Sequence, residues 1–321
     1  MYTVNIICLV LYKLLMAGEY NVTYITLDGH VEVQRYRYLY FVIMLTAYVL
    51  IICSNSTIVS IIALHRNLHE PMYVFIAALM VNSVLFSSAI YPKLLMDFLS
   101  EKQIISHSAC LFQWFIYYSL GCSEFLLLAA MAYDRYVSIC KPLQYPNIMR
   151  KITVQMLLIL AWLLPACQVS VPMIVSANKK LCHFNLKGII CNSTVQKLYC
   201  VTSRLLNIYG LAVLVTALIC PVLFILFTYI RIVIVCYRSS QEVRRKAAQT
   251  CLPHLLVLIN FTCLGAYDVL LLRLETDFPK TVRLTISLQI LLFHPLFNPI
   301  IYGLKMKEIN RQLKRLFCKR V

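Results

Sequence analysis

The chain has 321 residues, of which 61% are hydrophobic and only 13% are charged. Soluble domains carry about 25% charged residues, so this composition excludes an ordinary soluble domain and indicates that lipid is the solvent. The formal net charge of +17 would suit a nucleic-acid partner, but the basic residues lie in loops between apolar segments. We therefore expect a lipid membrane and no nucleic acid as the partner of these charges.

The N-terminal region, residues 1–38, is expected to lie outside the cell. It contains an apolar stretch at 4–17 that is short and interrupted by Lys13. This stretch is either a poor signal peptide or an upstream extension within residues 1–20, and we favour the extension. Asn21 then begins an Asn-Val-Thr sequon, which predicts glycosylation of this segment.

Seven apolar segments of membrane-spanning length follow one another between residues 39 and 302. They lie at about 39–64, 71–95, 110–138, 152–175, 206–235, 246–272 and 281–302. Their number and the scarcity of glycine predict an all-α membrane protein, built as one seven-helix bundle rather than as several domains.

The C-terminal tail, residues 303–321, is predicted to contain a short amphipathic helix. Between Lys305 and Phe317, cations alternate with apolar residues at a spacing that suits a helix lying on the membrane surface. Cys318 next to it is either palmitoylated or a free thiol.

The basic residues predict the orientation of the bundle. The loops after the first, third and fifth segments, together with the tail, hold the denser basic runs, such as Arg244-Arg245-Lys246 and Lys314-Arg315. By the positive-inside tendency, this side is cytoplasmic and the N-terminus is extracellular.

The third segment ends in MAYDRYVSICKP, residues 131–142, which places Asp134 and Arg135 side by side where hydrocarbon gives way to water. Ionisable groups at membrane depth are costly and usually functional, although a simple anchoring pair is an equally good interpretation from the chemistry alone. Together with LHEPMY (68–73), KAAQTCLPHL (246–255) and PLFNPIIY (295–302), this motif resembles the odorant receptors of the rhodopsin-like G-protein-coupled family, in its fish type. The resemblance covers the chain from about residue 24 to the C-terminus.

This resemblance implies an odorant receptor in the plasma membrane of sensory cilia that binds a small-molecule odorant and activates a heterotrimeric G protein of the olfactory stimulatory type. In the family the arginine is held by the adjacent aspartate at rest and is released to meet the G protein. The residues carried over to this coupling role are Asp134, Arg135, Tyr136, Tyr229, Lys246 and Tyr302. The family's aromatic motif in the sixth segment is replaced here by Phe261-Thr262-Cys263, which leaves its switch residue unassigned.

Four of the fourteen cysteines lie outside the apolar segments or at their ends: Cys110, Cys182, Cys191 and Cys200. Four cysteines allow three pairings, and the sequence alone does not choose among them. The resemblance implies the disulfides Cys110–Cys191 and Cys182–Cys200. Asn192, in the same long loop, begins a second sequon and is a candidate glycosylation site.

Helical spacing back from Arg135 predicts the inward face of the third segment, with Glu124, Gly121 and Tyr117 or Tyr118 at successive turns. Small residues and hydroxyls on three segments predict a compact, mostly apolar ligand pocket, although ordinary helix packing explains each position singly. The family implies that the ligand binds there. The predicted set is Tyr117, Tyr118, Gly121, Cys122, Val213, Ala217, Thr262 and Gly265.

Glu124 is either a protonated packing residue or a weak candidate for a cation site. The neutral Asn82-Ser83 stands where the family usually has an aspartate for sodium, which argues against a sodium site. We expect no other metal and no cofactor.

Two other classes were weighed. A receptor for a non-odorant ligand is the near alternative. A small transporter is less favoured because the chain has no internal repeat and one isolated intramembrane acid. No nucleophile–base pair or metal-ligand cluster is found in the sequence, so we expect no enzymatic activity.

Overall fold

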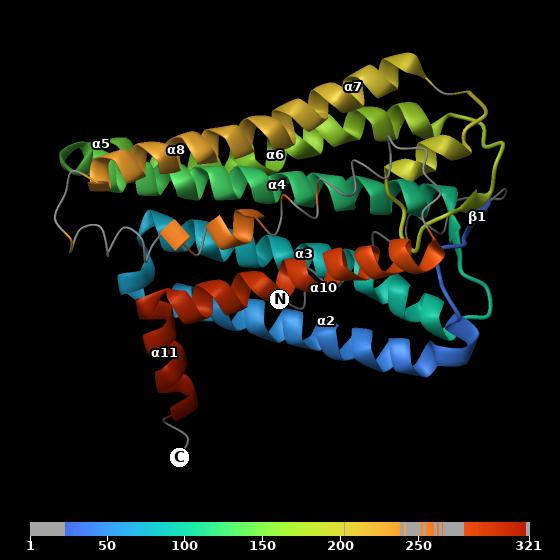
Figure 1. Cartoon of the computed structure of the whole chain (residues 1–321), viewed down its shortest axis with the longest axis horizontal. Helices are drawn as coiled ribbons and strands as arrows, with labels where there is room; N and C mark the ends of the chain where they lie inside the picture. The colour runs from blue at the N-terminus through green and yellow to red at the C-terminus, as the bar shows by residue number, and fades with distance from the viewer. Residues whose placement is uncertain are drawn as a thin grey trace.

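The computed structural model describes residues 23–201, 203–237, 241, 251–252, 255–259, 262, 265 and 279–318. In this part of the chain, six helices are long and apolar enough to cross a membrane. They run side by side as a bundle (Figure 1). The helices are α2 (Val33–Leu64), α3 (Pro71–Leu99), α4 (His107–Cys140), α6 (Lys151–Ala177), the continuous helix Arg204–Tyr237 that contains α7 and α8, and α10 (Lys280–Lys305).

The predicted sixth segment, 246–272, falls mostly outside the described residues. Those of its residues that are described are helical. The other predicted segments correspond to helices that extend further than expected. For example, α2 begins at Val33, well before residue 39, and α4 begins at His107, where the Ser106 hydroxyl accepts a hydrogen bond from the Ala109 amide at 3.3 Å and caps the helix.

The distribution of buried residues shows which helices form the core and which face lipid. On α3 and α4, large side chains such as Phe75, Leu79 and Met131 are fully buried. On α6 and α8, many large apolar side chains are exposed, among them Ile159 and Phe227. Exposed apolar side chains on helices at the edge of the bundle are expected when lipid, rather than water, surrounds them.

Two prolines in α10 leave backbone carbonyls without their usual partners, and other helices supply the missing donors. Pro295 and Pro299 have no N–H for the carbonyls of Leu291 and Pro295, four residues earlier. The Tyr91 hydroxyl donates to the Leu291 carbonyl at 3.0 Å, and the Asn55 amide donates to the Pro295 carbonyl at 2.9 Å. Side chains of α3 and α2 therefore bond to α10 at the two carbonyls that its prolines leave without a helical partner.

The helix from Arg204 to Tyr237 is not a uniform α-helix. Its first part, α7 (Arg204–Leu214), is joined to α8 (Cys220–Tyr237) by a π-helical turn, η4 (Val215–Ile219). A π-turn widens the helix locally and shifts the side chains that follow, and such turns are frequent at functional sites.

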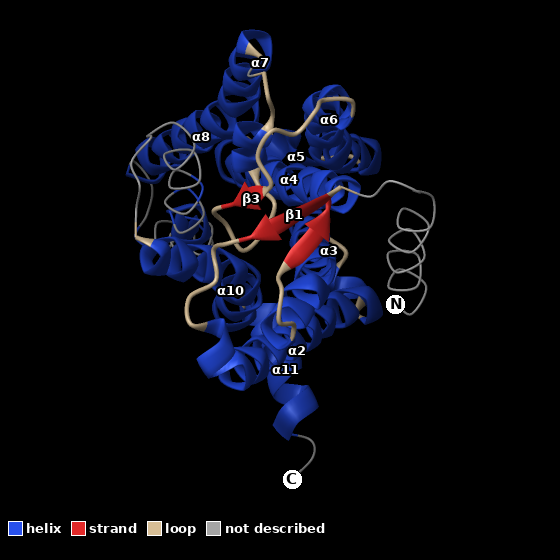
Figure 2. Cartoon of the chain, turned by 90° about the vertical axis from the view of Figure 1, so that its right-hand side faces the viewer, coloured by secondary structure: helices blue, strands red, loops and turns tan. Residues whose placement is uncertain are grey.

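One end of the bundle carries a small three-stranded sheet, which the sequence did not predict. The order is β2 (Ile104–Ser106), β1 (Tyr24–Leu27), β3 (Asn185–Leu186), with β1 antiparallel to β2 and parallel to β3. Gly29 follows β1, and a Cβ there would overlap the backbone of Gly188, so this close approach requires glycine. We call this end of the bundle the sheet end (Figure 2).

The opposite end carries the short helix α5 (Tyr145–Ile148) and the beginning of the C-terminal helix α11 (Lys307–Cys318). Figure 1 shows α11 turning away from the line of α10. Its apolar side packs against the bundle. Ile309 is fully buried, and a side-chain carbon of Leu313 would lie 3.3 Å from a Cβ placed on Gly303 of α10. The predicted amphipathic helix is therefore present, and part of its apolar side is covered by the bundle.

Candidate functional site

A cavity of about 490 Å³ lies between α4, α6 and α7 with η4, near the sheet end. This volume is within the usual range of small-molecule pockets. Of the predicted pocket residues, those that line the cavity are Tyr117, Tyr118, Gly121, Cys122, Val213, Ala217 and Gly265. Thr262 is described but is not among the lining residues.

The residues of α4 that line the cavity run from Trp114 to Phe125, about 16 Å along the helix at its usual rise. The inner part is apolar: Phe125 approaches Gly265, and Leu218 from η4 lies beside the same glycine. Gly121 has no atom within 4 Å of the position of its Cβ, so this glycine leaves open volume next to the helix. The inner cavity therefore suits an apolar group.

Polar side chains gather towards the sheet end of the cavity. The Tyr118 hydroxyl lies 2.6 Å from the Ser193 hydroxyl, and the Tyr209 hydroxyl donates to the Gln168 carbonyl at 2.9 Å. Gln196 and Asn207 line the same region. Sequence reasoning missed Gln168, Gln196, Ser193 and Asn207. Of these, the isolated amide of Gln168 within an apolar segment was the one available signal.

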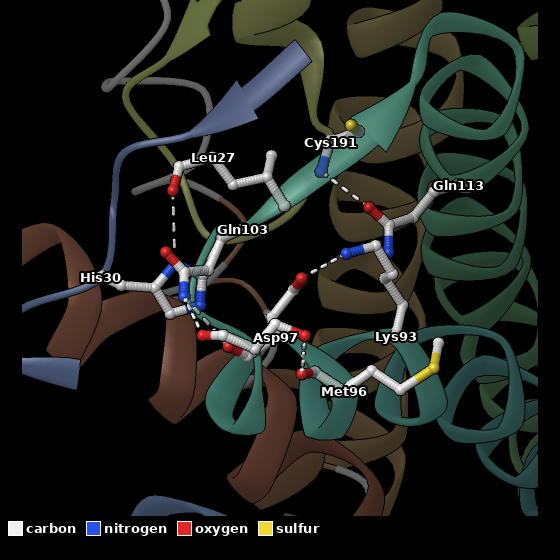
Figure 3. Close-up of polar contacts among 9 residues, drawn as sticks. Leu27, His30, Lys93, Met96, Asp97, Gln103, Gln113 and Cys191 are labelled. Carbon is white, nitrogen blue, oxygen red and sulfur yellow. Dashed lines mark hydrogen bonds and ion pairs between the residues drawn. The ribbon is translucent and has the colours of Figure 1, made fainter. Parts of the chain in front are cut away.

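The loop after α6 is fixed over the cavity by covalent and hydrogen bonds. The structure contains both disulfides that the resemblance implied, Cys110–Cys191 and Cys182–Cys200. The Cys191 amide also donates to the Gln113 side-chain oxygen at 2.8 Å, a contact drawn in Figure 3. The bridge to α4 thus holds Ser193 and Gln196 at the cavity wall.

A second cluster lies at the opposite end of α4. Asp134 is fully buried and accepts two hydrogen bonds from the adjacent Arg135 guanidinium, the one from Nε at 3.0 Å. Tyr145 of α5 donates its hydroxyl to the other Asp134 oxygen at 2.8 Å. Burial, together with the negative charge of Asp134, raises the pKa of Tyr145, so the phenol remains a donor. This tyrosine was not singled out from the sequence.

The remaining predicted coupling residues lie on different helices near this cluster. Tyr136 follows Arg135 on α4 and packs against the bundle core, while Tyr229 of α8 and Tyr302 of α10 are both buried. The Tyr229 hydroxyl has no hydrogen-bond partner among the described residues. Lys246 lies outside the described residues.

Glu124 is buried on α4 next to Phe125, at the inner end of the cavity and ten residues before Asp134. Asn298 donates its amide to Glu124 at 2.8 Å and to the Ser83 hydroxyl at 3.3 Å. Asn298 thus bonds to α3 and α4, whereas Tyr91 and Asn55 supply the donors for the carbonyls that the prolines of α10 leave free. The side chain of Asn82 also has a hydrogen-bond partner, because its oxygen accepts from the Trp162 indole N–H at 3.2 Å.

The two sequons differ in what the structure describes. Asn192 is partly exposed in the loop, and its side-chain oxygen accepts hydrogen bonds from the amide and hydroxyl of Thr194. Asn21 lies outside the described residues, as does the side chain of Cys318.

Comparison with known proteins connects this arrangement to one family. The sequence model of the family described as "Olfactory receptor" matches residues 43–320. Olfactory receptor 11A1 of Homo sapiens is 32% identical over 309 residues, covering 95% of this chain and 97% of that protein. Olfactory receptor 6K3 of Homo sapiens is 35% identical over 304 residues (94% and 91%), and Olfactory receptor 4B13 of Mus musculus is 31% identical over 312 residues (93% and 97%).

Proposed function

The chain belongs to the olfactory receptor family, and from this premise we propose that its odorant binds in the cavity between α4, α6 and α7 and controls the Asp134–Arg135 cluster. As a member of this family the chain is an odorant-sensing G-protein-coupled receptor, a multi-pass membrane protein and not an enzyme. The proposal concerns where the ligand binds and how binding reaches the G protein.

The observation that carries this proposal is that one helix, α4, contributes to both sites. It lines the cavity from Trp114 to Phe125 and carries Asp134 and Arg135 near its other end. Cys122 and Asp134 are twelve residues apart, about 18 Å along the helix. If α4 can adopt two placements in the bundle, a ligand that binds one placement more tightly shifts the equilibrium towards it. The far end of α4, with Asp134 and Arg135, then moves together with the end that contacts the ligand.

The cytoplasmic end would act through the release of Arg135. In the resting arrangement its guanidinium is held by Asp134, and Tyr145 stabilises the same carboxylate. Freed from Asp134, the arginine meets a heterotrimeric G protein, for which we propose the olfactory stimulatory type. Tyr136, Tyr229, Lys246 and Tyr302 complete the coupling region by resemblance to the family.

The orientation that supports this mechanism places the sheet end outside the cell. Both disulfides lie at that end, and disulfides persist in oxidising compartments. The opposite end carries the basic tail helix. We propose that residues 1–38 and the loop with Asn192 are extracellular, that 39–302 form the receptor bundle, that 303–321 are cytoplasmic, and that the receptor acts in the plasma membrane of sensory cilia.

Filling the cavity tests the ligand site. In Gly121→Leu, the new side chain enters open volume next to α4, so the response to every active odorant should fall at least about tenfold in potency while surface expression and ligand-free signalling stay unchanged. The matched control is Cys167→Leu, which introduces the same side chain at an exposed position of α6 outside the cavity lining. Unchanged dose–response curves in Gly121→Leu, with normal surface levels, would move the ligand site elsewhere.

A further inference from the structure

A small second cavity adjoins the ligand cavity on the side of the sheet end. It has a volume of about 20 Å³, room for about one water molecule. Gln196, Leu206 and Asn207 line both cavities and so form the wall between them. On the far side of this wall, the small cavity is lined by Lys179 and Tyr199.

Lys179 is a cation without an acidic partner among the described residues. Its ammonium lies over the Tyr199 ring, 5.6 Å from the centroid. That ring stays neutral, because burial raises the pKa of Tyr199 to about 12, and its hydroxyl is 3.0 Å from the His107 imidazole. Among the described residues, no acidic group therefore compensates the positive charge of Lys179 next to the ligand cavity.

The loop that carries Lys179 has the same sign of charge along its length. Residues 178–203 contain Lys179, Lys180, Lys187 and Lys197 and no aspartate or glutamate. A concentration of one sign of charge at the mouth of a cavity raises the local concentration of oppositely charged ligands and speeds their association. This loop therefore favours anions at the entrance.

The wall between the cavities offers hydrogen-bond donors. The side-chain amides of Gln196 and Asn207 line the cavities and have no hydrogen bond to another described side chain or backbone group. No described residue that lines the ligand cavity carries a formal charge. A charged group deep in that cavity would lose its hydration without compensation, whereas at the Gln196–Asn207 wall it meets two amides and lies towards an ammonium.

We propose that this receptor recognises small organic anions, carboxylates whose apolar body fills the inner cavity and whose charged end lies at the Gln196–Asn207 wall towards Lys179. This inference rests on the proposed ligand site and adds the chemical class of the ligand. The apolar inner end near Phe125 and Gly265 accepts the hydrocarbon part, and the uncharged outer amides orient the carboxylate.

The test compares acids with their uncharged analogues in cells that express the full receptor. Pentanoate, hexanoate and heptanoate are each measured against the methyl ester, first in the parent and then in Lys179→Gln. The carboxylates should be more potent than their esters. The variant should lose about two- to fivefold in potency towards the acids and nothing towards the esters, as expected for removing one partly exposed charge partner. Lys179→Glu should reduce acid potency on the order of tenfold, since like charges then oppose each other.

Lys180→Gln is the matched control, because it removes the same charge from the next residue, which is exposed and lines neither cavity. An equal loss of acid potency in Lys180→Gln and Lys179→Gln would overturn the proposed carboxylate position. Esters as potent as acids in the parent, or activation only by neutral odorants from a wider panel, would overturn the anion class while leaving the receptor function intact. A parent receptor that reaches the surface and responds to no odorant would instead overturn the proposed function.

Discussion

At the residue scale, the resting arrangement of Arg135 depends on a buried carboxylate with three hydrogen bonds. Two come from Arg135 itself and one from the Tyr145 hydroxyl. A buried charge is stable only when its partners are in place, so each lost partner weakens the resting state. The sequence motif pointed to the acid and the base, whereas Tyr145 was found only in the structure because it is eleven residues away on another helix.

Tyr145→Phe should therefore raise ligand-free signalling. Hydrogen bonds to charged groups contribute about 1.5–3 kcal/mol, and a loss of even about 1.4 kcal/mol from the resting state shifts a two-state equilibrium tenfold. Asp134→Asn should raise it further, and Arg135→Ala should abolish signalling with normal surface expression. The measurement is the second-messenger level without ligand at matched surface expression, with Tyr133→Phe as the control. A parent-like response from Arg135→Ala would refute the coupling role.

A second prediction at this scale concerns the Tyr91 hydroxyl, which donates to the Leu291 carbonyl that Pro295 leaves without a helical partner. Tyr91→Phe leaves the Leu291 carbonyl without its donor in a segment surrounded by hydrocarbon. We expect a loss of about 1 kcal/mol, seen as a lower thermal midpoint of the purified receptor. Tyr48→Phe is the control, because Tyr48 stacks on Tyr91 and its hydroxyl has no hydrogen bond to another described residue. Equal midpoints for both variants would show that the bond to Leu291 contributes no net stability.

At the scale of elements, the loop after α6 depends on its bridge to α4. Cys110→Ser should sharply reduce surface expression, since removing a native disulfide typically costs about 2–5 kcal/mol and the loop that holds Ser193 and Gln196 loses its tether. Cys53→Ser, at an exposed free cysteine of α2, should leave expression unchanged. Flow cytometry of intact cells gives the comparison, and normal surface levels in Cys110→Ser would contradict the structural role of the bridge.

The docking of β1 onto the bundle should weaken at acidic pH because of His30. This side chain is largely buried, and its ring lies 5.7 Å from that of Phe98 on α3. Its Nδ1 lies 3.4 Å from the Leu27 carbonyl oxygen (Figure 3). Burial, aided by Lys93 and opposed by the Leu27 carbonyl and Asp28, lowers the pKa of His30 from 6.5 to about 4. When β1 is undocked, the His30 imidazole is protonated below about pH 6.5, whereas in the docked form it is protonated only near pH 4. Protonation therefore favours the undocked form, and docking weakens progressively as the pH falls from 6.5 towards 4.

The expected loss is roughly 3 kcal/mol across that interval, at about 1.4 kcal/mol per pKa unit. Hydrogen exchange of the β1 amides, Tyr24–Leu27, should accelerate as the pH falls, after correction for the intrinsic pH dependence of exchange. In His30→Phe this extra acceleration should disappear. His183→Gln, at an exposed histidine of the loop, should behave like the parent. A corrected exchange rate that does not change with pH in the parent would exclude His30 as the cause.

At the scale of the whole molecule, the two ends of the bundle should face different compartments. An epitope tag at the N-terminus should be stained on intact cells, whereas a tag after Val321 should be stained only after permeabilisation, because the basic tail favours the cytoplasmic side. Glycosidase treatment should lower the mass of the parent, and Asn192→Gln should reduce that shift. Staining of the C-terminal tag on intact cells would reverse the assigned orientation.

The sequence by itself determined the helices of this protein and the motifs at their ends. In lipid each helix satisfies its own backbone, so length and hydropathy are enough to identify a span. The described helices therefore follow the predicted segments, and the amphipathic tail helix lies where expected. The short strands escaped prediction because two to four residues carry too little periodicity.

Only the tertiary structure decided which residues of different helices meet. Packing between helices in lipid depends on small residues and a few polar contacts, and these are set by how each helix is rotated rather than by local sequence. For this reason the sequence could not predict three sets of contacts. These are the hydrogen bonds of Tyr91 and Asn55 to the carbonyls of α10, the contact of Tyr145 with Asp134, and the placement of the Gln196 and Asn207 side-chain amides at the cavity wall. Sequence reasoning located most of one wall of the cavity, on α4, because helical spacing fixes a face within a single helix, whereas closing the cavity required the fold.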